Sequence, residues 1–448
     1  MDLADARALS ANVLAGGTPW RLVRLSDHAR ATVARWRENA PLGARDQQLA
    51  RILVDRGLAR PRFAPDWNRD DLEVIVPVHD DAVSLDRLLG ALAGFAVTVV
   101  DDGSSDPVAI ARCATDHGAV LVRLESNRGP ASARNAGASA TSGPWLWFID
   151  VDVDLEDAFA LAARLLASGR DPRVGAVAPR VRGARATGGR ARFERENGPL
   201  DLGRTGGLVA PQTARGYVPS ACLLVRRAAF AEGFDETLRV GEDVDLVWRL
   251  GDAGWLVRYD ADLVVGHHPR STWRAWWRQR VTYGTSAAAL ARRHGSRLAP
   301  VVLDEATLPV LGGLVTGSPG LAAAGAAILA RRIDRQLPAD LEGRRGLVAR
   351  LVARAIAGNV GGVARALVRT YAPLLVGAVL VPRLRRRVAI IAAIGTLWRW
   401  RGRGRIDARD VPFALADDIA YGVGVWLGAW RERDRTALTP VIRASARP

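Results

Sequence analysis

The chain contains no lysine, one methionine and two cysteines in 448 residues. Its 63 basic residues are therefore all arginine, and they exceed the 47 Asp and Glu residues to give a formal net charge of +16. Cys113 and Cys222 lie far apart in apolar stretches. This spacing fits no disulfide framework, metal motif or redox motif, and it indicates buried thiols in a reducing cytoplasm. The first residues lack the apolar core of a signal peptide, so we expect that the chain is not secreted.

The arginine excess would suit a nucleic-acid-binding protein, but no recognised nucleic-acid-binding module accompanies it. Alanine, glycine and arginine dominate the sequence, which points to genomic base composition as a main source of the arginine. We therefore predict that nucleic acid is not a partner. Attraction to anionic lipid or to a phosphorylated substrate fits the charge better. The length predicts two or three domains.

Short apolar runs that end in acidic residues recur through the first half of the chain. Runs at 73–78, 97–100 and 145–149 read as buried strands, and the segments 84–93 and 107–117 between them read as helices. In the first of these helices, leucines at 85, 88, 89 and 92 mark one face. The alternation predicts an α/β fold with a mostly parallel sheet and helices on both faces.

Asp150 and Asp152 directly follow the apolar run Trp145–Ile149. A strand that ends in Asp-x-Asp at the carboxyl edge of a sheet holds two hard oxygen ligands in a crevice, as a divalent cation bridging to phosphate requires. A solvated strand-ending turn is the alternative, but it explains poorly why three acidic clusters all follow strands. Asp154 continues the alternation, and we expect it to be solvated and not to be a ligand.

Five ordered motifs carry a resemblance to a known family. The motifs are Val76-Pro77-Val78, Val100-Asp101-Asp102-Gly103-Ser104, Arg134-Asn135-Ala136-Gly137, Asp150-Val151-Asp152 and Gly241-Glu242-Asp243-Val244-Asp245-Leu246. Their order and spacing resemble the family 2 glycosyltransferases with the Rossmann-like GT-A fold, over roughly residues 72–295. The resemblance implies an enzyme that moves a sugar from a nucleotide sugar to a hydroxyl acceptor.

The resemblance also implies a role for individual residues. Asp150 and Asp152 would hold Mg²⁺ or Mn²⁺ on the diphosphate of a UDP-sugar. His267 would lie near the metal, with His268 as an alternative. Pro77 and Asp102 would lie by the uracil and ribose, and Arg134 would lie near the nucleotide. Val78 and Asp101 would belong to the same nucleotide-sugar site.

Asp243 is the predicted general base, with Glu242 as its orienting neighbour. An acceptor hydroxyl needs a carboxylate within hydrogen-bond reach to take its proton, and a leaving nucleoside diphosphate needs its charge neutralised by a cation. The helix predicted from Asp245 onwards favours negative charge at its N-terminus, so a plain helix cap is the alternative. By the resemblance, one base without a paired nucleophile implies single displacement with inversion and a β-linked product.

The N-terminal residues 1–68 read as a separate unit. We predict a strand at 18–25, a helix from Ser26 to Trp36, a helix from Gln47 to Arg56 and a returning strand at 58–61. The pattern resembles the small winged-helix, PqqD-like domains that recognise leader peptides, and a packing appendage is the alternative. The sequence thus predicts three domains, at 1–68, 70–296 and 300–448.

The combination of these parts resembles the glycosyltransferases of mycofactocin systems, as do the segments Trp276–Ser286 and Asp417–Trp426. This resemblance implies UDP-glucose as donor and premycofactocin, a peptide-derived redox cofactor precursor, as acceptor of β-1,4-linked glucose. It also implies a precursor peptide at the N-terminal domain. A cell-envelope enzyme, such as one moving rhamnose to a lipid-linked glycan, and a non-catalytic peptide-recruiting scaffold are the alternatives.

Trp273 and Trp277 lie four residues apart and share a helix face. Core packing is one interpretation, and a platform on which the acceptor stacks is the other. Arg280 would then contact the acceptor or the diphosphate, and a plain solvated position on the helix is the alternative. Processive polysaccharide synthases carry a Gln-x-x-Arg-Trp motif in this region, and its absence here disfavours synthesis of a long polymer.

The last third of the chain alternates apolar runs with arginine. Residues 306–330 carry no charge, which is long enough to span a bilayer, but Gly317-Ser318-Pro319-Gly320 breaks the run and predicts two short helices. The runs 371–382 and 388–398 are too short to span. We expect helices that lie at the cytoplasmic face of the membrane, with integral insertion and a soluble helical cap as alternatives.

Overall fold

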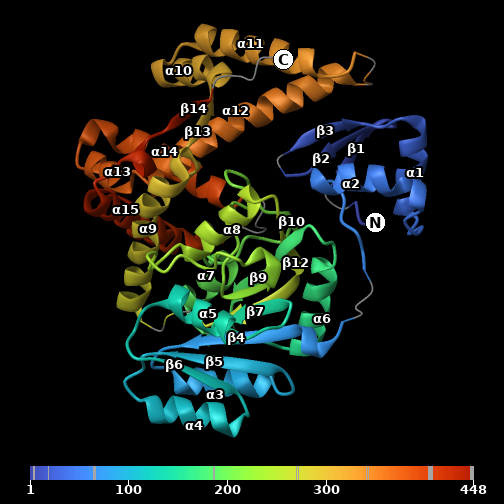
Figure 1. Ribbon diagram of the computed structural model, residues 1–448. Helices are drawn as coiled ribbons and strands as arrows, with labels where there is room; N and C mark the ends of the chain where they lie inside the picture. The colour runs from blue at the N-terminus through green and yellow to red at the C-terminus, as the bar shows by residue number, and fades with distance from the viewer. Residues whose placement is uncertain are drawn as a thin grey trace. The chain divides into compact units, whose positions relative to one another are not determined.

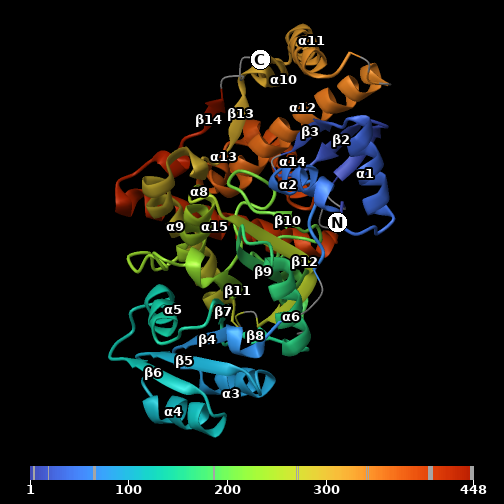
Figure 2. The same cartoon turned by 45° about the vertical axis from the view of Figure 1, so that its right-hand side comes forward.

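The computed structural model describes residues 1–3, 6–18, 20–63, 67–184, 187–268, 270, 272–339, 341, 343–401 and 407–443. The chain forms two compact units, residues 1–270 and 271–448. Figures 1 and 2 show the elements of both units from two directions. Each unit is described by itself below.

The N-terminal part of the first unit is a small antiparallel sheet backed by two helices. Its elements are β1 (Ala6–Ser10), β2 (Val13–Gly16), β3 (Arg21–Arg24), α1 (Asp27–Arg37) and α2 (Gln47–Asp55). Ser26 caps α1, because its hydroxyl oxygen accepts a hydrogen bond from the Ala29 N–H at 3.2 Å. Both helices were predicted, whereas the β1–β2 hairpin was not. The predicted strand at 58–61 is only an isolated bridge between Arg60 and Asp2.

This domain has a hydrophobic core of its own, in which Trp36, Leu53 and Leu58 are almost completely buried. Arg60 also forms ion pairs with Asp260, at 3.6 Å, and Asp262, at 3.4 Å, in the larger part of the unit. The domain is therefore stabilised both by its own core and by charged contacts within the first unit.

A mixed sheet forms the centre of the first unit, in the order β10-β12-β9-β11-β7-β4-β5-β6, with β8 paired to β12. The pairs β6–β5, β5–β4, β4–β7 and β9–β12 are parallel, and β11, β10 and β8 run antiparallel to their neighbours. The strands are β4 (Leu72–Val78), β5 (Ala96–Asp102), β6 (Val120–Leu124), β7 (Trp145–Ile149), β8 (Val153–Asp154), β9 (Val174–Gly183), β10 (Gly207–Leu208), β11 (Cys222–Arg226) and β12 (Leu256–His267).

Helices cover both faces of this sheet. One face buries Val76, Val99 and Trp147 against α3 (Ala82–Ala91), α4 (Pro107–Asp116) and α6 (Ala158–Gly169). The opposite face carries α5 (Pro130–Ser139), which approaches β4 so closely that a Cβ at Gly137 would lie 2.4 Å from Ile75 Cγ2. The remaining helices of the unit are α7 (Gly189–Asn197) and α8 (Glu242–Asp252). The predicted α/β sheet with two helical layers is therefore confirmed.

The second unit is mainly helical. It comprises α9 (Trp273–His294), α10 (Leu308–Thr316), α11 (Pro319–Gln336), α12 (Arg344–Arg369), α13 (Ala372–Val379), α14 (Arg385–Arg399) and α15 (Val411–Glu432), with the short parallel pair β13 (Val302–Asp304) and β14 (Val441–Arg443). The uncharged run 306–330 does break into two helices at Gly317, which adopts a left-handed φ of 70°. The second of them is not short, since it spans 18 residues.

Helix α9 falls in this second unit, although we placed it with the catalytic core. The reason is its contact with α15, where glycines let the two backbones meet. A Cβ at Gly424 would lie 2.0 Å from the Val281 carbonyl oxygen, and one at Gly284 would lie 2.2 Å from the Tyr421 carbonyl oxygen. By length and composition alone, α12 could cross a membrane, as the core helix of a soluble protein also could.

The glycine contact between α9 and α15 gives a stability prediction. Gly424→Ala should lower the free energy of unfolding by about 1–3 kcal/mol, because the added methyl group meets the Val281 carbonyl oxygen. Thermal and urea unfolding of the full-length protein would measure the change.

Gly358→Ala in α12 is the matched control, because nothing lies within 4 Å of a Cβ at that position. Alanine loses less backbone freedom on folding than glycine, so this variant should be more stable by about 0.5–1 kcal/mol. Equal effects of the two substitutions would contradict the close packing of α9 and α15.

Candidate active site

The guanidinium of Arg134, on α5, joins two carboxylates that come from different parts of the chain. Nη2 donates to Asp150 Oδ1 at 2.6 Å, and Nη1 donates to Glu242 Oε1 at 2.8 Å. The side chain is only 3% exposed and lies over the Phe234 ring, 5.3 Å from its centroid. Burial lowers the pKa of Arg134, but Asp150 and Glu242 outweigh it and raise the pKa. Arg134 is therefore a permanent buried cation between the end of β7 and the start of α8.

Backbone interactions at the start of α5 fix where Arg134 lies. Asp102, at the end of β5, accepts hydrogen bonds from the backbone N–H groups of Arg128, at 2.7 Å, and Gly129, at 2.8 Å. Asn135 holds the other side of α5, since its amide exchanges hydrogen bonds with the Phe234 backbone. The glycine at 137 completes the placement by letting the helix lie close against β4.

Asp101 and Asp102 are both buried, and their carboxylates are engaged inside the protein. Asp101 pairs with Arg123 and accepts a hydrogen bond from the Ser104 N–H at 2.8 Å. Val78 is buried next to Asp101 on the neighbouring strand, and Pro77 lies one residue before it. These residues line the carboxyl edge of β4 and β5, where open α/β sheets bind ligands. In the structure, the two carboxylates shape this edge through these contacts, and an ionised carboxylate can accept further hydrogen bonds.

Asp152 faces His267, at the end of β12, with 3.2 Å between Oδ1 and Nε2. Burial raises the pKa of Asp152, but His267 outweighs it, and the pKa is lowered. Burial likewise lowers the pKa of His267, but Asp152 outweighs it, and that pKa is raised. Asp152 is thus an ionised carboxylate whose imidazole partner is also a potential metal ligand.

The structure distinguishes the two neighbouring histidines. His268 turns to Asp154, with 2.8 Å between Nε2 and a carboxylate oxygen, and only its backbone N–H reaches Asp152, through the carbonyl oxygen. Asp154 also pairs with Arg87 at 3.1 Å. Our expectation that Asp154 is simply solvated was therefore incomplete, because its half-exposed carboxylate holds two ion pairs. The strand pairing explains this, since β8 sets Asp154 beside Gly266 of β12.

Asp243 lies at the start of α8, directly after Glu242. The helix begins after Gly241, which adopts a left-handed φ of 87°, and three acids fill its first turn. The Asp243 carboxylate accepts a hydrogen bond from the Val244 N–H at 2.8 Å. Burial and the charge of Glu242 raise the pKa of Asp243 to about 7. A carboxylate with such a pKa can take up a proton near neutral pH, as a general base must.

The residues predicted to bind metal offer a chemically suitable set. Asp150 and Asp152 supply oxygen ligands, and His267 adds a nitrogen that Mn²⁺ accepts more readily than Mg²⁺. Four carboxylates gather here around one arginine and one histidine: Asp150, Asp152, Glu242 and Asp243. A divalent cation would offset this excess of negative charge, so the residues fit the group that the family resemblance implies.

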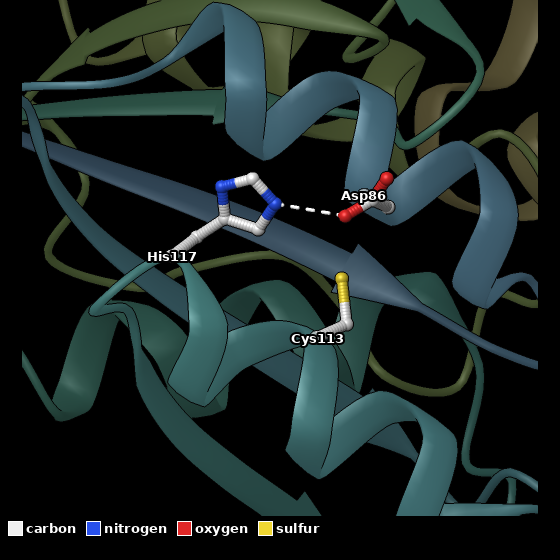
Figure 3. A group of neighbouring side chains, drawn as sticks. All are labelled: Asp86, Cys113 and His117. Carbon is white, nitrogen blue, oxygen red and sulfur yellow. Dashed lines mark hydrogen bonds and ion pairs between the residues drawn. The ribbon is translucent and has the colours of Figure 1, made fainter.

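Among the described residues, one group of three potential metal ligands has all its ligand atoms within 4.8 Å of one another, and it is not the set of Asp150, Asp152 and His267. It comprises Asp86 on α3 with Cys113 and His117 at the end of α4, as Figure 3 shows. His117 Nε2 and Asp86 Oδ1 are 2.8 Å apart. Burial, followed by Asp86 and Asp116, raises the pKa of the Cys113 thiol. This group was not predicted, because the spacing of the two cysteines gives no sign of a site made of one cysteine, one histidine and one aspartate.

Trp273, Trp277 and Arg280 lie in the second unit. Trp276 is completely buried, whereas Trp273 and Trp277 are exposed, and Trp273 stacks on Phe413 with 5.7 Å between ring centroids. Arg280 is only 2% exposed, and its Nε donates to Asp417 at 2.6 Å. The structure therefore gives the Arg280 guanidinium a packing role between α9 and α15, which the helical spacing alone did not reveal.

The chain is similar to several known proteins. Residues 73–234 match the family described as glycosyl transferase family 2. The pre-mycofactocin glycosyltransferase of Mycobacterium tuberculosis (strain ATCC 25618 / H37Rv) is 36% identical over 455 residues, which cover 96% of this chain and 95% of that protein. The N-acetylglucosaminyl-diphospho-decaprenol L-rhamnosyltransferase of the same strain is 29% identical over 236 residues, which cover 44% of this chain and 76% of that protein.

Among solved structures, the mannosyltransferase PcManGT from Pyrobaculum calidifontis, in complex with GDP-Man and Mn²⁺, aligns with a TM-score of 0.40 and 22% identity. The alignment covers 69% of this chain and 88% of that one. The α/β sheet with helices on both faces has the architecture of the GT-A fold, as the resemblance implied. The near full-length relationship shows that the chain belongs to glycosyl transferase family 2, in the group that includes pre-mycofactocin glycosyltransferase.

Proposed function

We propose that this glycosyltransferase moves glucose from UDP-glucose to premycofactocin, by single displacement with inversion, and builds a short β-1,4-linked oligomer. The observation that carries the proposal is the joining of the strand-end carboxylate Asp150 and the helix-start carboxylate Glu242 by Arg134. This contact brings the donor-metal residues and the base into one site. The relative that matches over nearly the whole chain supports the choice of acceptor.

In this proposal Asp150, Asp152 and His267 would hold Mg²⁺ or Mn²⁺ beside the donor diphosphate. The cation would supply a Lewis acid that neutralises the charge developing on the leaving diphosphate. Arg134 keeps Asp150 in place through its hydrogen bond to Oδ1. Pro77, Val78, Asp101 and Asp102 border the nucleotide at the carboxyl ends of β4 and β5.

Asp243 takes the proton of the acceptor hydroxyl as its oxygen attacks the anomeric carbon. The bond from that carbon to the diphosphate oxygen breaks, and the nucleoside diphosphate leaves with the electron pair. Glu242 raises the pKa of Asp243 through its charge, which makes Asp243 a stronger base. Glu242 is held by Arg134, so the same cation that steadies Asp150 also orients the neighbour of the base.

The acceptor side of the proposal involves two further parts of the chain. Exposed Trp273 and Trp277 present aromatic rings of the kind that stack on sugar faces and aromatic aglycones. The N-terminal domain would bind the precursor peptide, a role suggested only by its size and pattern. We propose that the enzyme works in the cytoplasm, where UDP-sugars are made.

A cell-envelope function is the second candidate, since the rhamnosyltransferase relative shares the catalytic core. That relationship covers less than half of this chain, whereas the pre-mycofactocin relationship extends over both units. A non-catalytic scaffold is disfavoured, because the carboxylates needed for metal and base are all present and grouped.

Incubation with UDP-glucose, Mn²⁺ and premycofactocin should yield a hexosylated acceptor, detected by mass spectrometry. The reaction should stop in excess chelator and resume when Mg²⁺ or Mn²⁺ is restored, because the leaving diphosphate needs the cation. Full activity in chelator would contradict the metal assignment. Transfer to a polyprenyl-linked sugar but not to premycofactocin would favour the cell-envelope function.

Asp243→Asn should lower kcat by about 10²–10⁴-fold, because an amide cannot take the acceptor proton. Binding of UDP, measured by calorimetry with Mn²⁺ present, should change little. Asp252→Asn, at the exposed end of the same helix α8, is the matched control and should keep full activity. If UDP binding and turnover fell together in the Asp243 variant, Asp243 would be a structural residue and not the base.

The pH profile of kcat/KM should show an acid limb near 7, because Asp243 must be unprotonated to act and its pKa is raised to about 7. Activity should therefore fall as the pH drops through that value. Glu242→Gln should move the limb to lower pH, since the substitution removes a neighbouring negative charge. If the acid limb of the profile does not move in the Glu242→Gln variant, the limb reports the titration of a group other than Asp243.

A further inference from the structure

One segment of the second unit has a charge pattern found nowhere else in the chain. Residues 343–406 contain fourteen arginines and no Asp or Glu, although the whole chain has 47 acidic residues. Genomic base composition explains abundant arginine but not the loss of acids, which are frequent in the rest of the chain. The segment covers α12, α13 and α14, and the structure describes it up to residue 401.

Three of these arginines serve the interior of the unit. Arg365, Arg369 and Arg399 pair with the buried carboxylate of Asp418, on α15. Their charge is balanced there, because Asp417 adds a second buried carboxylate to the same cluster. These contacts explain why Arg365, Arg369 and Arg399 are present. They do not explain the exposed arginines of the segment.

A second group of arginines lies on the surface at the turn from α13 into α14. Arg383, Arg385, Arg386 and Arg387 are exposed, and none of them forms an ion pair with a residue that the structure describes. Arg385 donates a hydrogen bond to the Val379 carbonyl oxygen at 3.0 Å, which ties the group to the end of α13. Four adjacent like charges without acids would repel one another unless an anionic partner were present.

Large apolar side chains are exposed immediately beside these arginines. Leu374 is 58% exposed and Leu380 is 79% exposed, and the exposed valines at 376, 379 and 381 lie between or next to them. We call residues 374–387, with their apolar and arginine side chains, the basic corner. Contiguous exposed apolar residues beside an all-positive cluster are typical of a membrane-contacting surface.

An apolar pocket of about 470 Å³ adjoins the same helix. Leu374, Leu375 and Ala378 of α13 line one wall, and Val363 and Leu367 of α12 line another. Leu374 both lines this pocket and is exposed at the surface, so the apolar surface beside the arginines continues into the pocket.

Spanning of the bilayer does not suit this region. Although α12 has 26 residues, arginines at 344, 345, 350, 354, 365 and 369 leave only 355–364 free of charge. A span needs about 20 predominantly apolar residues, and a charged side chain at the bilayer centre is costly. Arg365 and Arg369 are moreover held by Asp418 inside the unit.

We propose that the basic corner docks this enzyme on the surface of a bilayer that contains anionic phospholipid. Leu374, Leu380 and their neighbouring valines enter the boundary between headgroups and acyl chains, and the four arginines bind lipid phosphates. Charge complementarity favours an anionic bilayer as the partner, because a surface with four arginines and no acidic residue attracts a dense array of negative charges. Nucleic acid would meet the arginines but would leave the apolar side chains without a partner. The proposal does not depend on which sugar or acceptor the enzyme uses.

Co-sedimentation of the full-length protein with phospholipid vesicles tests this proposal. The protein should bind vesicles of phosphatidylcholine with 30% phosphatidylglycerol, and vesicles of phosphatidylcholine alone should bind at least about tenfold less. Raising the salt from 0.05 to 0.5 M should weaken binding, because salt shortens the range of the attraction. A quadruple variant with Gln at positions 383, 385, 386 and 387 should lose at least about tenfold in affinity for the anionic vesicles.

A second quadruple variant separates local recognition from the overall positive charge. Gln at the exposed arginines 112, 164, 195 and 204, outside the segment, removes the same net charge and should change vesicle binding less than about twofold. Leu380→Asp should also weaken binding, because it places a charge among the inserted side chains. Both quadruple variants should keep wild-type transfer to a soluble acceptor.

Three results would overturn the proposal. The first is a wild-type protein that stays in the supernatant with anionic vesicles at low salt. The second is an equal loss of binding in the two quadruple variants. The third is a dimer, measured by light scattering, that dissociates in Leu380→Asp while vesicle binding is unchanged, since this would assign the corner to a second copy of the chain.

Discussion

The buried ion pairs of Arg134 are the contacts on which the rest of the candidate site depends. One guanidinium, almost fully removed from water, is shared by a carboxylate at the end of β7 and another at the start of α8. Removing one partner of a buried pair leaves an uncompensated charge, at a cost of about 3–5 kcal/mol. The position of Asp150, after β7, and that of Glu242, at the start of α8, are therefore coupled through a single side chain. Much of the surrounding structure serves to place it, from the backbone contacts of Asp102 to the glycine at 137.

The same contacts explain the electrostatics of the site. Four carboxylates with one arginine and one histidine leave negative charge that burial makes expensive, and the raised pKa of Asp243 is one result. A divalent cation on Asp150 and Asp152 would supply the missing positive charge without any change in the fold. The cation would also bind the Asp150 carboxylate, which pairs with Arg134. Because Arg134 also pairs with Glu242 of α8, cation binding and the position of α8 should influence each other.

Most of this core could be predicted from the sequence, because its signals are local. Strand-ending acids, the start of α1 at Ser26 and the break at Gly317 each depend on neighbours within a few residues. The order of the motifs then identified the family. The ion-pair partners of Arg134 could not be predicted from neighbouring residues. Asp150 is 16 residues and Glu242 is 108 residues away in sequence, and the fold brings them together.

Contacts between distant segments account for what was missed. We predicted an acceptor contact for Arg280, but the Arg280 guanidinium donates a hydrogen bond to Asp417 of α15. The sequence also could not rank His267 against His268, which the pairing of β8 with β12 separates. The Asp86, Cys113 and His117 group needs two helices to pack side by side before it exists.

Anomalous diffraction at the manganese absorption edge, from crystals grown with Mn²⁺ and UDP, tests the central assignment most directly. The account predicts a manganese peak at coordination distance from the Asp150 or Asp152 carboxylate, with the diphosphate bound to the same ion. A peak confined to Asp86, Cys113 and His117, or UDP bound away from the carboxyl ends of β4, β5 and β7, would contradict it.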